Sequence, residues 1–268
     1  MVLKLCANND NRSFWGETIV QGVARSHARK VRERSARESR RPVRAGADQG
    51  HSSKRSQRSL ATSERILDSA EELFAQRGIY GVTMREIAEL AGVDTALLHY
   101  YFESKRGVFH AVFARRADVL NTARLAEFDR YEAENKGVYD VDEIVAAYLR
   151  PMFKLNREGG KGWRNFCAFA GNLGSAPELA AIFAEKFEPV LKRFFGLLRK
   201  AVPDADEADL YWCYHLFSGS IMVVNMANHS IGKVSGGLCE AEDFDALEPR
   251  MARYSAEGIR QLLLKKYL

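Results

Sequence analysis

The chain has 268 residues, of which 46% are hydrophobic, and a formal net charge of +5. This length is enough for one small and one medium domain, and no run of eighteen apolar residues predicts a membrane span. The N-terminus has no apolar segment followed by a cleavage site, which argues against a secretory signal. The four cysteines form no Cys-x-x-Cys pair, so we expect free thiols in a cytoplasmic protein rather than a disulfide framework or a zinc knuckle.

The positive charge is concentrated at the N-terminal end. Residues 1–58 hold 14 Lys and Arg against 5 Asp and Glu, whereas residues 59–268 carry a balance of −4. Because residues 25–58 contain few large apolar side chains, we expect disorder there. Two interpretations of the extension stay open: a basic arm that binds DNA phosphates, or an upstream stretch without an evolved role that follows from a misplaced start. We favour phosphate contacts for its last cations, Lys54, Arg55 and Arg58.

Residues from Thr62 onward show the spacing of helices. Thr62 is expected to cap a first helix that ends at Gly78, and its apolar positions recur every three or four residues at Ile66, Leu67, Ala70, Leu73 and Phe74. A second, short helix is predicted to open after Thr83 and to end at Gly92. A third is capped by Asp94 and runs to about Tyr101, and Ser104 caps a long fourth helix that begins at Lys105.

The remainder is predicted to be helical as well. The expected helices span about 142–156 with a kink at Pro151, about 163–173, a segment from Pro177 that Pro189 bends, a segment that Asp204 and Glu207 open and that ends near Gly232, and about 247–265. No convincing strand or repeat is found. The predicted fold class is therefore all-α, with an extension (1–58), a three-helix helix-turn-helix domain (59–106) and a C-terminal helical domain (107–268) for effector binding and dimerisation.

The short helices on either side of Ala91-Gly92-Val93 have the geometry of a DNA-binding helix-turn-helix. In such a motif the second helix enters the major groove and the first crosses the backbone. The glycine permits the tight turn. Because Leu98, Tyr101 and Phe102 are expected to pin the second helix to its neighbours, the positions that can face outward are Thr95, Ala96, Leu97, His99 and Tyr100.

On these residues the chain resembles the TetR family over about residues 60–110. The family pattern is matched by Thr83, Ile87-Ala88, Ala91-Gly92-Val93, Tyr101-Phe102 and Lys105 at the family's spacing. The sequence departs from the common pattern at Asp94, Ala96 and His99. Asp94 still caps a helix, whereas the other two bear on which operator is recognised, so no family operator is assumed.

The resemblance implies a set of DNA-binding residues. Thr83 and Lys105 are expected to hold phosphates, while the candidates for base or phosphate contact are Arg85, Thr95, Leu97, His99 and Tyr100. Arg85 is the best candidate to recognise guanine; the alternatives are a solvated or phosphate-bound arginine, and for His99 a surface position with no role in DNA binding. Residues 59–106 hold 5 basic and 8 acidic side chains, so the arm of Lys54, Arg55 and Arg58 gains importance for affinity.

The last two predicted helices carry unusually continuous apolar surface. Residues 210–226 are apolar nearly all round, and the final helix has Met251, Tyr254, Ile259, Leu262 and Leu263 on one side. The resemblance implies that these helices form a homodimer interface. A symmetric dimer would place two helix-turn-helix motifs about 34–36 Å apart on a near-palindromic operator.

Bulky side chains of the C-terminal domain are candidates to line a ligand pocket. They are Trp163, Phe166, Phe169, Trp212, His215, Phe217, Met222 and Met226, with Asn172 and Asn225 as polar anchors. The alternative is that most of them are simply core. Around residues 188–191 the sequence also loosely resembles the fatty-acid-responsive branch of the family, which makes a fatty acyl thioester the candidate effector.

Other classes of protein find little support. No Gly-rich phosphate loop, His-Glu-x-x-His or Gly-x-Ser-x-Gly motif occurs, and the six histidines are dispersed, so we expect neither an enzyme nor a metal site nor a cofactor. The sequence therefore predicts a transcriptional repressor released from its operator by a small, largely apolar ligand. The alternative is a helix-turn-helix protein, or an activator, that does not respond to a ligand.

Overall fold

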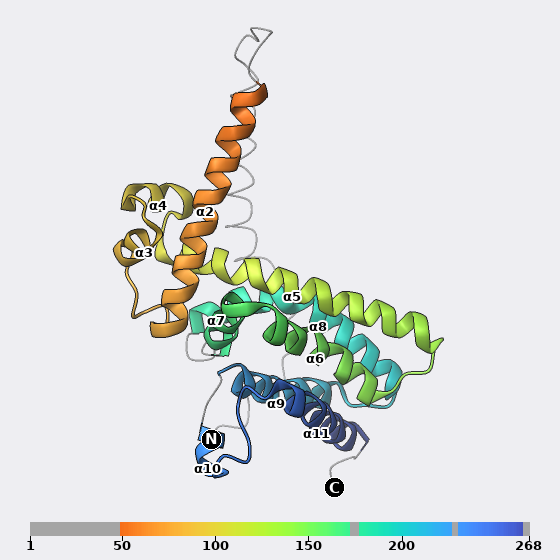
Figure 1. The fold of residues 1–268 in the computed structure, drawn as a ribbon. Helices are drawn as coiled ribbons and strands as arrows, with labels where there is room; N and C mark the ends of the chain where they lie inside the picture. The colour runs from red at the N-terminus through yellow and green to blue at the C-terminus, as the bar shows by residue number, and fades with distance from the viewer. Residues whose placement is uncertain (1–48, 172–176, 227–229, 265–268) are drawn as a thin grey trace, which may run out of the picture. The chain divides into compact units, whose positions relative to one another are not determined.

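The computed structural model describes residues 49–171, 177–226 and 230–264. In these residues every regular element is an α-helix, which confirms the predicted fold class (Figure 1). The helices are α2 (Gln49–Arg77), α3 (Met84–Ala91), α4 (Thr95–Phe102), α5 (Lys105–Asn135), α6 (Val141–Glu158), α7 (Gly160–Gly171), α8 (Pro177–Ala201), α9 (Glu207–Asn225), α10 (Ser230–Val234) and α11 (Phe244–Leu264). None of these helices combines the length and low polarity that a membrane span requires.

The helix α2 is longer than the sequence predicts. Thr62 does not cap it but lies inside it, where the Thr62 hydroxyl donates to the carbonyl oxygen of Arg58 at 2.9 Å. The predicted disorder is therefore wrong over residues 49–58, while residues 25–48 lie outside the described part of the chain. A polar segment can extend a helix that is already nucleated by a packed apolar face, because propagation costs far less than nucleation. The chain divides into two compact units within α2, between Arg55 and Ser56.

Two C-terminal helix boundaries also differ from the prediction. Asp206, not Asp204, caps α9, and its carboxylate accepts from the backbone N–H of Ala208 at 2.8 Å. This helix ends at Asn225, so it does not reach Gly232, and a separate short helix, α10, occupies residues 230–234. The cap is the residue directly before the first helical residue, because only there does a short side chain reach the next turn's free N–H groups.

The long helix α5 organises the described fold. It begins beside α4 and then contacts α6, α7 and α8, while α9 contacts α7 and α11 (Figure 1). One continuous core includes Phe74 of α2, Phe113 and Phe128 of α5, and Phe194 of α8. Because α5 contributes to the core beside α2 and to the core beside α8, it links the helix-turn-helix directly to the C-terminal helices.

Candidate nucleic-acid interface

The N-terminus of α3 is fixed by a reciprocal capping arrangement. The backbone N–H of Glu86 donates to the Thr83 hydroxyl at 3.2 Å, and the backbone N–H of Thr83 donates to the Glu86 carboxylate at 2.8 Å. The hydrogen bond from the Thr83 hydroxyl and a second from Arg77 lower the pKa of Glu86 to about 2. The predicted start of α3 is confirmed. However, the hydroxyl expected to hold a phosphate is engaged in the cap.

The turn between α3 and α4 has the geometry that the sequence predicts. Gly92 has φ of 62°, in the left-handed region where a glycine carries no Cβ penalty. The backbone N–H of Val93 donates to Ala88 at 3.0 Å and closes the end of α3. The Asp94 carboxylate then accepts from the backbone N–H of Ala96 at 2.6 Å, which confirms Asp94 as the cap of α4.

One side of α4 is held by the protein and the other faces outward. Leu98 is fully buried, and the Tyr101 hydroxyl lies 2.8 Å from the Ser59 hydroxyl of α2. Four of the five predicted outward positions are exposed, namely Ala96, Leu97, His99 and Tyr100, and Thr95 is half-buried. The exposed strip is therefore free to lie against a groove of DNA, as a recognition helix requires.

His99 has a defined orientation on that strip. Its Nδ1 lies 3.0 Å from the carbonyl oxygen of Glu103, which only accepts, so Nδ1 donates in this hydrogen bond. In the neutral ring, Nε2 is then the acceptor and points its lone pair away from the bond. Cytosine and adenine present amino donors in the major groove that such an acceptor can recognise.

The cations around the motif differ in how free they are. Arg85 is exposed and has no hydrogen-bond partner among the described residues. The ammonium of Lys105 donates to the carbonyl oxygen of Val82 at 2.9 Å and ties the start of α5 to the segment before α3. Because an ammonium has three N–H donors, its phosphate contact stays a prediction. Next to it, Arg106 is exposed, a position that the sequence prediction omitted. Arg58 is exposed on α2; Lys54 and Arg55 belong to the same helix, but their side chains are outside the described set.

A buried charge cluster joins this region to the C-terminal helices. Glu71 of α2 is 2% exposed and accepts from Arg115 and Arg116 of α5, the latter through Nε at 3.0 Å and Nη2 at 3.1 Å. The Arg116 guanidinium also lies 5.5 Å from the ring centroid of Trp163 in α7. A Cβ on Gly162 would come within 2.3 Å of Arg116, so α7 approaches the cluster closely. We call Glu71, Arg115 and Arg116 the Glu71 cluster.

An aromatic interior continues from Trp163 into the C-terminal helices. The ring centroids of Trp163 and Phe166 are 5.5 Å apart, those of Phe166 and Phe113 are 5.8 Å apart, and those of Phe113 and Phe187 are 6.1 Å apart. Phe183 stacks on Phe187 with centroids 4.3 Å apart. These five rings, from α5, α7 and α8, form what we call the aromatic interior.

The predicted ligand-pocket residues do not gather in one place. Trp163 and Phe166 belong to the aromatic interior, whereas Trp212, His215 and Met226 are exposed. Phe217 is buried in the core, and Met222 and Asn225 are half-buried. The Phe169 side chain and all of Asn172 lie outside the described set. Periodicity alone could not assign these residues, because α9 is apolar on both its inner and its outer side.

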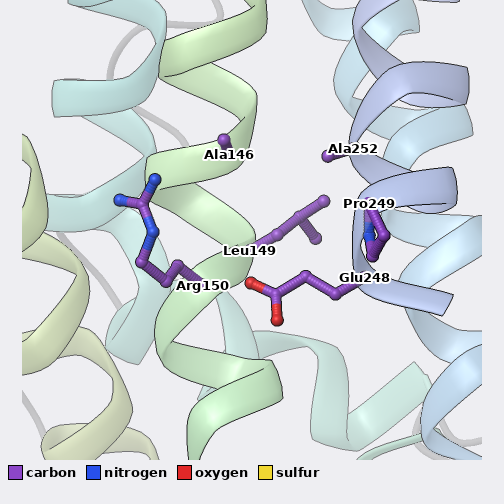
Figure 2. A pocket seen from close by; sticks show the side chains of 6 residues that line it. All are labelled: Ala146, Leu149, Arg150, Glu248, Pro249 and Ala252. Atoms are coloured by element: carbon purple, nitrogen blue, oxygen red, sulfur yellow. The ribbon is translucent and has the colours of Figure 1, made fainter. Parts of the chain in front are cut away.

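A separate groove lies between α6 and α11. It is lined by Ala146, Leu149, Arg150, Glu248, Pro249 and Ala252, none of which was a predicted ligand residue (Figure 2). Both charged side chains are already paired, Arg150 with Glu127 at 2.6 Å and Glu248 with Arg157 at 2.7 Å. The groove therefore has an apolar surface, and its two charged side chains are not free to bind a polar ligand.

Two interior charges escaped the sequence prediction. Glu71 lies four residues after Leu67 and three before Phe74, and Arg124 lies four after Leu120 and four before Phe128. Both positions fall on the apolar face of their helices, which is the one available indication that these charges are buried. A buried charge requires a partner or a function, so both residues are candidate functional residues.

Comparison with known proteins identifies both halves of the fold. Residues 66–112 match the family model "Bacterial regulatory proteins, tetR family", and residues 146–258 match "Tetracyclin repressor-like, C-terminal domain". The regulator RutR of Escherichia coli is 32% identical over 114 residues, which are 42% of this chain and 50% of RutR. The negative regulator of the biofilm operon, IcaR of Staphylococcus aureus, is 28% identical over 92 residues, 34% of this chain and 46% of IcaR. The chain thus spans about half the length of the curated relatives it matches.

A solved structure shares the fold. The transcriptional regulator FadR of Bacillus subtilis, determined in complex with stearoyl-CoA, aligns with a TM-score of 0.51 and 18% identity over 73% of this chain and 98% of FadR. At this identity the likeness concerns the fold alone.

Proposed function

The chain belongs to the TetR family of bacterial regulatory proteins, and from this premise we propose that it is a transcriptional repressor that binds a near-palindromic operator as a homodimer. The observation that carries the proposal is the exposed strip of α4 beside the capped α3–α4 turn. RutR and IcaR are regulators of the helix-turn-helix type, and IcaR is a negative one. Such a role places the protein with the chromosome, in the cytoplasm.

The proposed dimer uses the outer face of α9, defined by Trp212, Leu216, Gly219 and Val223. Trp212 is 61% exposed, Leu216 59% and Val223 62%, and a Cβ added to Gly219 would meet no atom within 4 Å. These four residues recur at helical spacing, so they form one continuous apolar strip. A strip of this kind on a single subunit is typical of a surface that a second copy covers. The neighbouring α11 adds Tyr254, which is likewise exposed.

The proposed effector is a small, largely apolar molecule bound near the aromatic interior. A fatty acyl thioester is the first candidate, supported by the resemblance around residues 188–191 and by the stearoyl-CoA in the FadR structure of similar fold. Trp163 is the ring of the aromatic interior that lies beside Arg116, and Arg116 contacts Glu71 of α2. A ligand that moves α7 would therefore displace α2 and the attached α3–α4 pair, and would favour a state with weaker operator affinity.

The first experiment is selection of genomic DNA fragments by the purified full-length protein, followed by sequencing. The proposal expects enrichment of one near-palindromic sequence whose half-sites are about one helical turn, or a whole number of turns, apart. Enrichment without any shared sequence, or no retention of DNA at low salt, would contradict it. A ligand-independent regulator would select the same kind of site but would keep it in the presence of every apolar effector tested.

Arg85→Ala is expected to relax specificity at a single position of the selected site. If Arg85 donates both N–H groups to a guanine, the variant loses about 1–3 kcal/mol of discrimination at that base pair and little at the others. Binding of the selected operator and of its single-base variants, measured by fluorescence anisotropy, checks this. A uniform loss across all sequences would assign Arg85 to a phosphate, and no loss at all would leave it solvated.

Changing Lys54, Arg55 and Arg58 together to Ala is expected to weaken binding to all DNA sequences. In a dimer these residues can neutralise six phosphates, each worth about 0.9 in the slope of log K against log salt, so that slope should fall by up to about 5. Anisotropy titrations between 50 and 200 mM salt (roughly the range over which such contacts are lost) measure it. The control changes three exposed cations of the C-terminal domain, Lys154, Lys233 and Arg253, to Ala. An unchanged salt slope in the first variant would show that Lys54, Arg55 and Arg58 do not bind DNA phosphates.

A further inference from the structure

Arg124 of α5 is a charged side chain enclosed by the C-terminal helices. It is 2% exposed, and its guanidinium carbon lies 3.9 Å from the ring centroid of Tyr148 and 5.7 Å from that of Phe187. Its Nε donates to the backbone carbonyl oxygen of Tyr148 at 3.0 Å. The two rings and the single carbonyl leave the charge itself without an opposite charge, since no carboxylate among the described residues pairs with it.

The free hydrogen-bonding capacity of Arg124 is large. Its Nη1 and Nη2 carry four N–H groups, and in the described part of the chain none of these has an acceptor. The part-buried Arg115 and Arg116 of the same helix differ from Arg124, because both bind Glu71. Buried charges are normally paired, since an isolated ion loses its hydration and gains nothing in return. In the described part of the chain, Arg124 therefore lacks the anionic partner that a buried arginine ordinarily has.

Other polar atoms near this position are also without partners. The amide nitrogen of Asn156, two helical turns beyond Tyr148 on α6, and the amide oxygen of Asn121, three residues before Arg124, are buried and have no hydrogen bond. Burial raises the pKa of the Cys167 thiol of α7 to about 12, and the nearby charge of Arg124 acts in the opposite direction. In addition to its aromatic rings, the interior thus has unmet donors on Arg124 of α5 and Asn156 of α6, and one unmet acceptor on Asn121.

We propose, building on the repressor function proposed above, that Arg124 binds the carboxylate of an apolar carboxylic acid and that such an acid, in place of the acyl thioester named there, is the effector. The guanidinium fork matches a carboxylate in two parallel hydrogen bonds, and one negative charge neutralises one positive charge. The apolar part of the acid is accommodated by the aromatic interior, which contacts Arg124 through Phe187. A dianionic phosphate would leave excess charge among these rings, and a thioester carbonyl would leave the arginine charged and unpaired.

The test compares two acids with their uncharged amides on the full-length protein. Octanoate and 3-phenylpropanoate are titrated calorimetrically, each against its own carboxamide, with octanoyl-CoA as a further probe. At least one acid is expected to bind, and to bind more tightly than its amide. The Arg124→Met substitution is expected to lower the affinity for that acid by about 30-fold, which corresponds to the loss of a charge-assisted hydrogen-bond pair. Arg130→Met is the matched control on the same helix, because Arg130 is exposed and pairs with Glu127 and Glu134, and it should leave binding unchanged.

A second readout is independent of any ligand. Because Arg124→Met removes an unpaired buried charge, the ligand-free variant is expected to unfold at the same temperature as the wild type or a higher one. Unfolding several degrees lower would assign Arg124 a purely structural role and overturn the inference. It is equally overturned if neither acid binds, if acid and amide bind equally, or if octanoyl-CoA alone binds. In each of these cases the same sample is also tested for selection of an operator from genomic DNA. If it still selects one, only the carboxylate site at Arg124 is contradicted; if it does not, the proposed repressor function is contradicted as well.

Discussion

Replacement of Leu216 by glutamate is expected to produce a monomer whose affinity for the operator is at least 100-fold (about 2.7 kcal/mol) below that of the wild type. Leu216 lies in the middle of the outer face of α9, where it is 59% exposed on a single subunit. In a symmetric interface the substitution places two carboxylates in an apolar contact, and the desolvation of each costs several kcal/mol. The monomer then contacts one half-site and loses the phosphate contacts of the second subunit.

The measurement combines sedimentation equilibrium with anisotropy titration of the selected operator. Val138→Glu is the matched control, because Val138 is also a highly exposed apolar residue but lies in the connection between α5 and α6, outside the outer face of α9. It should remain dimeric with wild-type affinity. A Leu216→Glu protein that stays dimeric would place the interface elsewhere, and a monomer that binds the operator with full affinity would refute the requirement for a dimer.

Glu71→Gln is expected to lower the free energy of unfolding by about 3 kcal/mol, because it leaves two arginines without their shared buried carboxylate. For a unit of this size the midpoint of thermal unfolding should fall by about 6–12 °C. The same variant should respond less to effector, since Glu71 is the point where α2 is bound to Arg116 and, through it, to Trp163. Thermal denaturation and operator release by effector measure the two effects.

Glu64→Gln serves as the control for that prediction. Glu64 also pairs with Arg115, at 2.8 Å, but its side chain is 59% exposed, so the loss should be less than about 1 kcal/mol and the effector response should persist. Equal stability of the two variants would show that the Glu71 cluster contributes no more than a surface ion pair. A Glu71→Gln protein that is destabilised but still released normally would assign the cluster to stability alone.

The local interactions of the helix-turn-helix were predictable because each spans a few residues. Thr83 bonds with Glu86, Asp94 with Ala96, and Ser104 with Gly107, so the sequence neighbourhood contains both partners of each cap. Gly92 adopts a positive φ that favours glycine for reasons within its own residue. The start of α2 was not predictable in this way, because its polar extension depends on a helix that packing elsewhere has already formed.

The amino-acid sequence by itself therefore determined the helical class, the α3–α4 motif and the family. Tertiary structure alone decided which charged residues are buried and which partners they contact. Glu71 pairs with arginines 44 and 45 residues away, Lys105 donates to a carbonyl oxygen 23 residues away, and Arg124 is enclosed by α6 and α8. It also decided that Trp212 faces out of α9 while Phe217 faces in. The physical reason is that spacing along a helix defines its faces, but only the packing of α5 against the other helices determines what each face touches.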